Sequence, residues 1–191
     1  MTALLTAVLA FGALAGCTAS QTGGNPTTAQ SAGTKQTSSE PTSDGPDAGL
    51  SIAKYVSNPC SILTASQVTT LGSVRAPEPG TGELGPNCVW RGQDVIKNSK
   101  YTVHTTENKS FEDIINNVKA NPVFTDKKID GVRVISTSQT DASTGCLTTL
   151  QASKTDSVTV QVATAADERA AKPACTETER VAQLIITNLK G

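Results

Sequence analysis

The sequence predicts an α+β domain in which a twisted antiparallel sheet carries helices packed mainly on one face. Apolar and polar residues alternate within several short segments, and turn residues separate these segments, as in antiparallel hairpins. Segments with helical spacing and capping residues lie between or after them, and too few long crossovers occur for a parallel sheet. Four cysteines within the predicted domain, residues 50–191, are able to form two disulfides.

The first element of the domain is a short capped helix. Thr64 is a favourable N-cap, and Gln67 three residues later completes a capping box. Gly72 is expected to end this helix. Residues 76–86 are rich in proline and glycine and are predicted to form a loop.

Two strands are predicted next, at residues 88–91 and 101–106. Cys88 and Trp90 share one face of the first, because side chains alternate along a strand. Trp90 is a candidate ligand contact, although a place against the nearby disulfide is the stronger expectation. His104, the one histidine, is expected to be a surface or edge residue of the second strand.

A second helix is predicted after the N-cap residue Ser110, with Asp113 in its first turn. Asn121 and the proline after it mark its end. Its apolar residues have helical spacing and are expected to form one buried stripe: Phe111, Ile114, Ile115 and Val118.

Two hairpins are predicted after this helix. Residues 123–129 and 132–136 flank Asp130-Gly131, a dipeptide suited to a tight turn. Residues 146–152 and 158–163 flank a polar turn, and valines alternate cleanly along the second of these strands.

The last helix is expected to begin at Thr176 as N-cap, with Glu179 closing a capping box. Its apolar face is predicted to consist of Val181, Leu184, Ile185 and Leu189.

Of the five cysteines, Cys17 lies near the N-terminus and the other four lie in the predicted domain. Four cysteines allow three connectivities, which sequence alone does not resolve. We favour the two local closures, Cys60 with Cys88 and Cys146 with Cys175, each of about 30 residues. A zinc site is disfavoured because C-x-x-C spacing is absent, and no metal or other cofactor is expected.

The chain begins with features of an exported lipoprotein. An apolar run ends in Leu-Ala-Gly before Cys17, so residues 1–16 are predicted to be a lipoprotein signal peptide. Cys17 is then the lipid attachment site and anchors the protein in the membrane. No lysine or arginine precedes Cys17, and we expect basic residues upstream of Met1. Residues 17–49 are rich in Ser, Thr, Pro and Gly and are predicted to be a disordered tether.

The domain resembles a known family at four short motifs. These are Asn-Pro-Cys-Ser-Ile-Leu-Thr at 58–64, Gly-Pro-Asn-Cys-Val-Trp at 85–90, Gly-Cys at 145–146 and Pro-Ala-Cys at 173–175. In these motifs the chain resembles the uncharacterised actinobacterial cell-envelope lipoproteins of the mycobacterial LprB and LprC type. The resemblance implies an anchored, extracytoplasmic protein with two disulfides, and it supplies no reaction.

No catalytic set emerges from the residues. The Gly-x-Gly-x-x-Gly at 80–85 is flanked by prolines and lacks the strand-to-helix context of a dinucleotide site. His104 has no evident partner for general-base chemistry, and no serine lies in a nucleophile elbow. Acidic residues near turns and helix starts are expected to be solvated or capping rather than a catalytic pair: Glu107, Glu112, Asp126 and Asp130.

The formal net charge of -1 does not indicate the excess of basic residues that is typical of nucleic-acid-binding proteins. We therefore expect a non-catalytic binding or scaffolding domain on the extracytoplasmic face of the cell membrane. Its partner is expected to be an envelope protein, a lipid or a glycan. A carrier of an apolar ligand, with a pocket between sheet and helices, is the alternative; an envelope hydrolase is less favoured.

Overall fold

The computed structural model describes residues 49–191. The predicted signal peptide, Cys17 and all but the last residue of the predicted tether lie outside this range. Within it, no helix has both the length and the apolar character that crossing a membrane requires.

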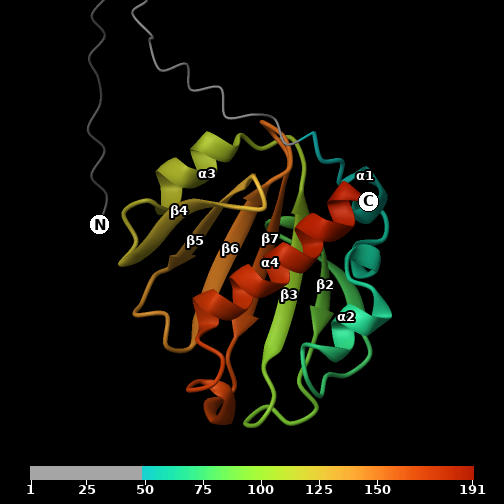
Figure 1. Cartoon of the computed structure of the whole chain (residues 1–191), viewed down its shortest axis with the longest axis vertical. Coiled ribbons are helices and arrows are strands. Elements are labelled where there is room, and N and C mark those ends of the chain that lie inside the picture. The colour runs from blue at the N-terminus through green and yellow to red at the C-terminus, as the bar shows by residue number, and fades with distance from the viewer. Residues whose placement is uncertain (1–48) are drawn as a thin grey trace, which may run out of the picture. The chain divides into compact units, whose positions relative to one another are not determined.

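A seven-stranded antiparallel sheet dominates the domain, with the strand order β1-β2-β3-β7-β6-β5-β4 (Figure 1). The predicted antiparallel sheet, accompanied by helices and two disulfides, is therefore confirmed. The strands are β1 (Glu78–Gly82), β2 (Gly85–Trp90), β3 (Lys100–Thr106), β4 (Val123–Ile129), β5 (Val132–Ser138), β6 (Gly145–Gln151) and β7 (Ser157–Ala163).

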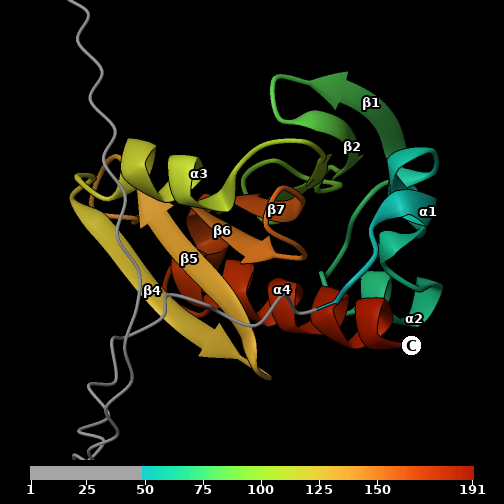
Figure 2. The ribbon, with the colours of Figure 1, turned by 90° about the horizontal axis from the view of Figure 1, so that it is seen from above.

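Helices lie on both sides of this sheet. The long C-terminal helix α4 crosses one face and contacts β5, β6 and β7, whereas α3 lies on the other face (Figure 2). The short N-terminal helices contribute to the core on the α4 side. The helical elements are α1 (Ala53–Val56), η1 (Pro59–Ile62), α2 (Ala65–Thr69), α3 (Phe111–Val118), η2 (Ala166–Glu168) and α4 (Ala174–Lys190).

Strand alternation produces the main core. Val103 pairs with Val160, and Val158 pairs with Leu150, so these side chains lie on the same face of adjacent strands. Val181 of α4 belongs to the same cluster and, like these four, is almost completely buried. Burying a side chain of this size contributes about 1.5–3 kcal/mol, which fixes the strand register and holds α4 against the sheet.

The disulfides join Cys60 of η1 to Cys88 of β2, and Cys146 of β6 to Cys175 of α4. This is the local pairing favoured from the sequence. The bridges close loops of 28 and 29 residues. One ties the N-terminal helices to the sheet, and the other ties the C-terminal helix to it.

Several local predictions are confirmed. The Thr64–Gln67 capping box is complete, and the Ser110 hydroxyl accepts a hydrogen bond from the Asp113 backbone N–H. The β4–β5 turn contains Asp130 and Gly131 at φ +49° and +81°, the left-handed geometry that this dipeptide accommodates.

Several boundaries were predicted wrongly. Helices α1 and η1 precede the capped helix α2, and strand β2 begins at Gly85 rather than at Cys88. Residues 76–86 contain strand β1, which pairs with β2 along its whole length. As an edge strand, β1 tolerates Pro79 because one side of its backbone needs no partner. Helix α4 begins at Ala174 rather than after Thr176. Glu179 does not close a capping box; its carboxylate binds Lys127 at 2.6 Å and Ser136 at 2.9 Å.

Candidate functional site

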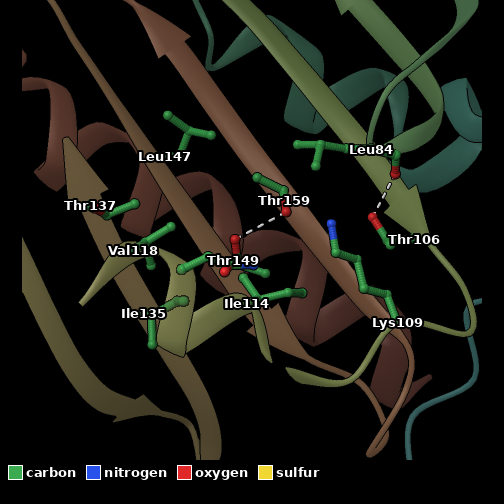
Figure 3. A pocket seen from close by; sticks show the side chains of 11 residues that line it. Leu84, Thr106, Lys109, Ile114, Val118, Ile135, Thr137, Leu147, Thr149 and Thr159 are labelled. Atoms are coloured by element: carbon green, nitrogen blue, oxygen red, sulfur yellow. Dashed lines mark hydrogen bonds between the residues drawn. The ribbon is translucent and has the colours of Figure 1, made fainter. Parts of the chain in front are cut away.

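A small pocket lies on the face of the sheet opposite α4, between α3 and the β1–β2 turn (Figure 3). Its volume is about 140 Å³. We call it the α3 pocket. The residues that line it are Leu84, Thr106, Lys109, Ile114, Asn117, Val118, Ile135, Thr137, Leu147, Thr149 and Thr159.

The threonines of the pocket floor contribute apolar rather than polar surface. The hydroxyls of Thr149 and Thr159, on neighbouring strands, hydrogen-bond each other at 3.0 Å. The hydroxyl of Thr137 accepts a hydrogen bond from Asn121 at 2.8 Å. Because each hydroxyl is satisfied within the protein, a ligand finds few free polar groups here. The floor therefore favours an apolar occupant.

Helix α3 forms one wall of the pocket, and two of its four large apolar residues face the cavity. Phe111 and Ile115 are buried and pack with Ile135 of the sheet. Ile114 and Val118 are only partly buried and line the pocket. The expectation that all four residues form one buried stripe is thus corrected. Two of them pack on the sheet, and the other two present aliphatic side chains to the pocket.

The β1–β2 turn forms the opposite wall, and the hairpin curls toward the α3 side of the sheet (Figure 2). The carbonyl of Leu84 accepts a hydrogen bond from the Thr106 hydroxyl at 2.5 Å. Gly85 has φ +102°, and a Cβ at this position would collide with the backbone oxygen of Thr105. Glycine thus allows the turn to approach β3 closely and places Leu84 beside the pocket.

A single cationic side chain lines the pocket. Lys109 is exposed and extends from the β3–α3 connection toward Thr159 (Figure 3). Its backbone N–H donates to the carbonyl of Thr155 at 2.8 Å, which fixes the start of the side chain. A positive charge beside an apolar cavity suits an apolar group that carries a carboxylate next to it.

His104 neighbours the pocket but does not line it. It pairs in register with Thr159 on the same face of the sheet. Contrary to the surface or edge expectation, it lies on the inner strand β3 and is only 9% exposed. A Cβ on Gly82 would lie 3.7 Å from its ring, so the hairpin covers it. Burial lowers the pKa of His104, and Lys100 lowers it further.

The imidazole of His104 forms no ion pair with a carboxylate among the described residues. Its Nδ1 is buried without a hydrogen-bond partner among the described residues. The predicted acidic candidates Asp126 and Glu112 instead bind Arg133, at 2.7 Å and 2.5 Å. Hydrogen bonds that Arg133 donates to Asp126 and Glu112 raise the pKa of Arg133 despite its partial desolvation. These carboxylates therefore form an ion-pair cluster.

Trp90 lies in the main core on the α4 side and is 0% exposed. This position argues against the ligand contact considered from the sequence, so Trp90 is a core residue. The Gly-x-Gly-x-x-Gly at 80–85 forms part of β1 and its turn into β2, with no helix following it. In residues 49–191 no cluster of three or more His, Cys, Asp or Glu side chains is arranged to hold a metal ion.

The sequence suggested a pocket between sheet and helices only as an alternative, and it identified neither the position nor the lining residues of the α3 pocket. The sequence hint to it is that threonines such as Thr149 and Thr159 lie beside the apolar core residues of their strands and therefore face away from the main core. Such residues read as solvent-facing until the elements that cover them are known.

Comparison with known proteins yields one match. The family model described as "Protein of unknown function (DUF3558)" matches residues 12–188. No curated protein and no solved structure matches the chain.

Proposed function

The chain belongs to the DUF3558 family of proteins of unknown function, and from that premise we propose a binding role argued from geometry. The domain binds an envelope partner through the α3 pocket, which receives one apolar side chain of that partner. It performs no catalysis. The protein is an exported lipoprotein, anchored through Cys17 at the extracytoplasmic face of the cell membrane and akin to actinobacterial envelope lipoproteins.

The main observation in support of a binding role is that the α3 pocket is small and has a mainly apolar lining. A cavity of about 150 Å³ lined by aliphatic side chains is known to accept benzene, a ring the size of a phenylalanine side chain. Pockets for whole small molecules usually begin at about 300 Å³. At about 140 Å³, the α3 pocket fits one ring or branched aliphatic group, which favours a protein anchor over the carrier alternative.

The chemistry of the partner follows from Lys109. An aliphatic or aromatic residue placed next to a carboxylate, from an acidic neighbour or a chain terminus, satisfies both the cavity and the ammonium group. Because Lys109 is exposed, the charge contributes to selectivity more than to affinity.

N-acetyl-leucinate provides the simplest probe, since it joins one branched side chain to one carboxylate. It has 12 non-hydrogen atoms, and at about 0.3 kcal/mol per atom its Kd is expected near 2 mM. We expect titration to shift the methyl NMR resonances of Ile114, Val118 and Leu147. N-acetyl-leucinamide, which lacks the charge, is expected to bind about twofold to fivefold more weakly, and Lys109→Gln should abolish that difference.

A pocket-filling variant and a matched control test the location. Val118→Phe places a ring in the cavity, whereas Asn116→Phe adds the same ring to an exposed position on α3. We expect Val118→Phe to remove binding of N-acetyl-leucinate and Asn116→Phe to retain it. Equal binding by both variants would refute the proposed site, and circular dichroism establishes that both are folded.

A further inference from the structure

The β2–β3 connection, residues 91–99, presents two adjacent aliphatic side chains to solvent. Val95 is 81% exposed and Ile96 is 59% exposed, and they are the only large hydrophobic residues this exposed in residues 49–191. The connection lies at the end of the sheet opposite the β6–β7 turn, as the antiparallel pairing of β3 with β7 requires (Figure 1).

Hydrogen bonds order this connection, and the ordered conformation keeps the side chains of Val95 and Ile96 exposed. The Asp94 carboxylate accepts from the backbone N–H groups of Ile96 at 2.9 Å and Lys97 at 3.3 Å. The Ile96 carbonyl accepts from the Asp167 N–H at 3.1 Å. The hydroxyl of Ser99 donates to Glu168 at 2.6 Å. A loop ordered in this way loses little conformational entropy when it docks.

A basic pocket adjoins the aliphatic tip. It has a volume of about 270 Å³, and Val95 is one of its lining residues. Arg75, Arg91 and Lys100 also line it, and no carboxylate does. Arg91 uses only its Nε to bind Glu78, at 3.1 Å. Lys100 has no ion-pair partner within the part of the chain that the structure describes.

We propose that this surface docks on an anionic phospholipid membrane, with Val95 and Ile96 entering the interface and the basic pocket binding a lipid phosphate. Guanidinium groups bind phosphate oxygens in matched geometry, and aliphatic side chains beside cations favour the boundary between headgroups and acyl chains. A uniformly acidic protein surface, with no apolar patch, would satisfy the cations but leave the two aliphatic side chains in water. The site is separate from the α3 pocket and does not depend on it.

Tryptophan fluorescence in the full chain tests this docking locally, whatever else holds the chain to vesicles. Trp90 is buried and provides a constant background. In Val95→Trp, vesicles with 30 mol% phosphatidylglycerol and brominated acyl chains are expected to shift the emission to the blue and quench it. Thr155→Trp, in the β6–β7 turn, should be unaffected. Quenching of both tryptophans equally, or of neither, would overturn the proposal.

Charge variants test the basic pocket in the Val95→Trp chain. Arg75→Gln with Lys100→Gln is expected to lower the equilibrium constant for docking, measured from the quenching of the introduced tryptophan, about 25-fold, because each lost charge near an anionic surface costs about fivefold. Lys128→Gln with Lys154→Gln makes the same charge change elsewhere and should have little effect. Glycerol phosphate should compete for the pocket without shifting the emission, which separates a lipid surface from a free phosphate. An equal loss in both double variants would contradict a role for the basic pocket.

Discussion

Removal of either disulfide is expected to cost nearly the same stability, because the two bridges close loops of nearly the same length. Cys146→Ala with Cys175→Ala opens a loop of 29 residues, and Cys60→Ala with Cys88→Ala opens one of 28. The loop-entropy relation gives about 3.6 kcal/mol for each. Alanine is the appropriate replacement because Cys88 and Cys146 are buried, and a serine hydroxyl there would need a partner.

The assay is urea unfolding at neutral pH, followed by circular dichroism. We expect each double variant to have a free energy of unfolding about 3–4 kcal/mol below that of the wild type. A loss under about 1 kcal/mol in either, or a difference above about 1.5 kcal/mol between them, would refute the view that both bridges act mainly by restricting the unfolded chain.

Two further predictions concern the buried Glu177, which accepts hydrogen bonds from Tyr101 at 2.8 Å and Arg180 at 2.7 Å, and the β1–β2 hairpin. Burial alone would raise the pKa of Glu177, but hydrogen bonds from Arg180 and Tyr101 outweigh it and lower the pKa below the usual 4.5. The folded state then binds fewer protons, so this stabilisation is present above about pH 4.5 and is lost as pH falls below it. Glu177→Gln should flatten that loss in urea unfolding measured from pH 6 to pH 3; an unchanged slope would count against it. Gly85→Ala forces a left-handed residue against Thr105 and should cost more than about 1 kcal/mol, measured by thermal unfolding. No change in the midpoint would show that the hairpin turn adjusts freely.

Local signals made much of the fold predictable. Thr64 with Gln67 marks a helix start through its own hydrogen bonds, and Asp130-Gly131 specifies a turn through its own backbone preferences. The alternating valines of β7 indicate which face belongs to the main core, together with α4. These features depend on neighbours in the sequence, and for that reason a single sequence reveals them.

The features that were missed depend on contacts distant in the sequence. Strand β1 carries proline and glycine and has no apolar alternation, so only its pairing with β2 makes it a strand. His104 looks solvent-facing until the hairpin around Gly82 covers it. The α3 pocket arises because Leu84 and α3, which lie far apart in sequence from its floor, meet over the same threonines.

The most direct test of the central claim is the contact between probe and pocket. Intermolecular nuclear Overhauser effects between the methyl groups of N-acetyl-leucinate and the protein report which side chains surround it. We predict contacts from the leucine methyls to Ile114, Val118 and Leu147, with the acetyl group outside the cavity. Contacts located on another surface, or none at a saturating probe concentration, would contradict a binding role for the α3 pocket.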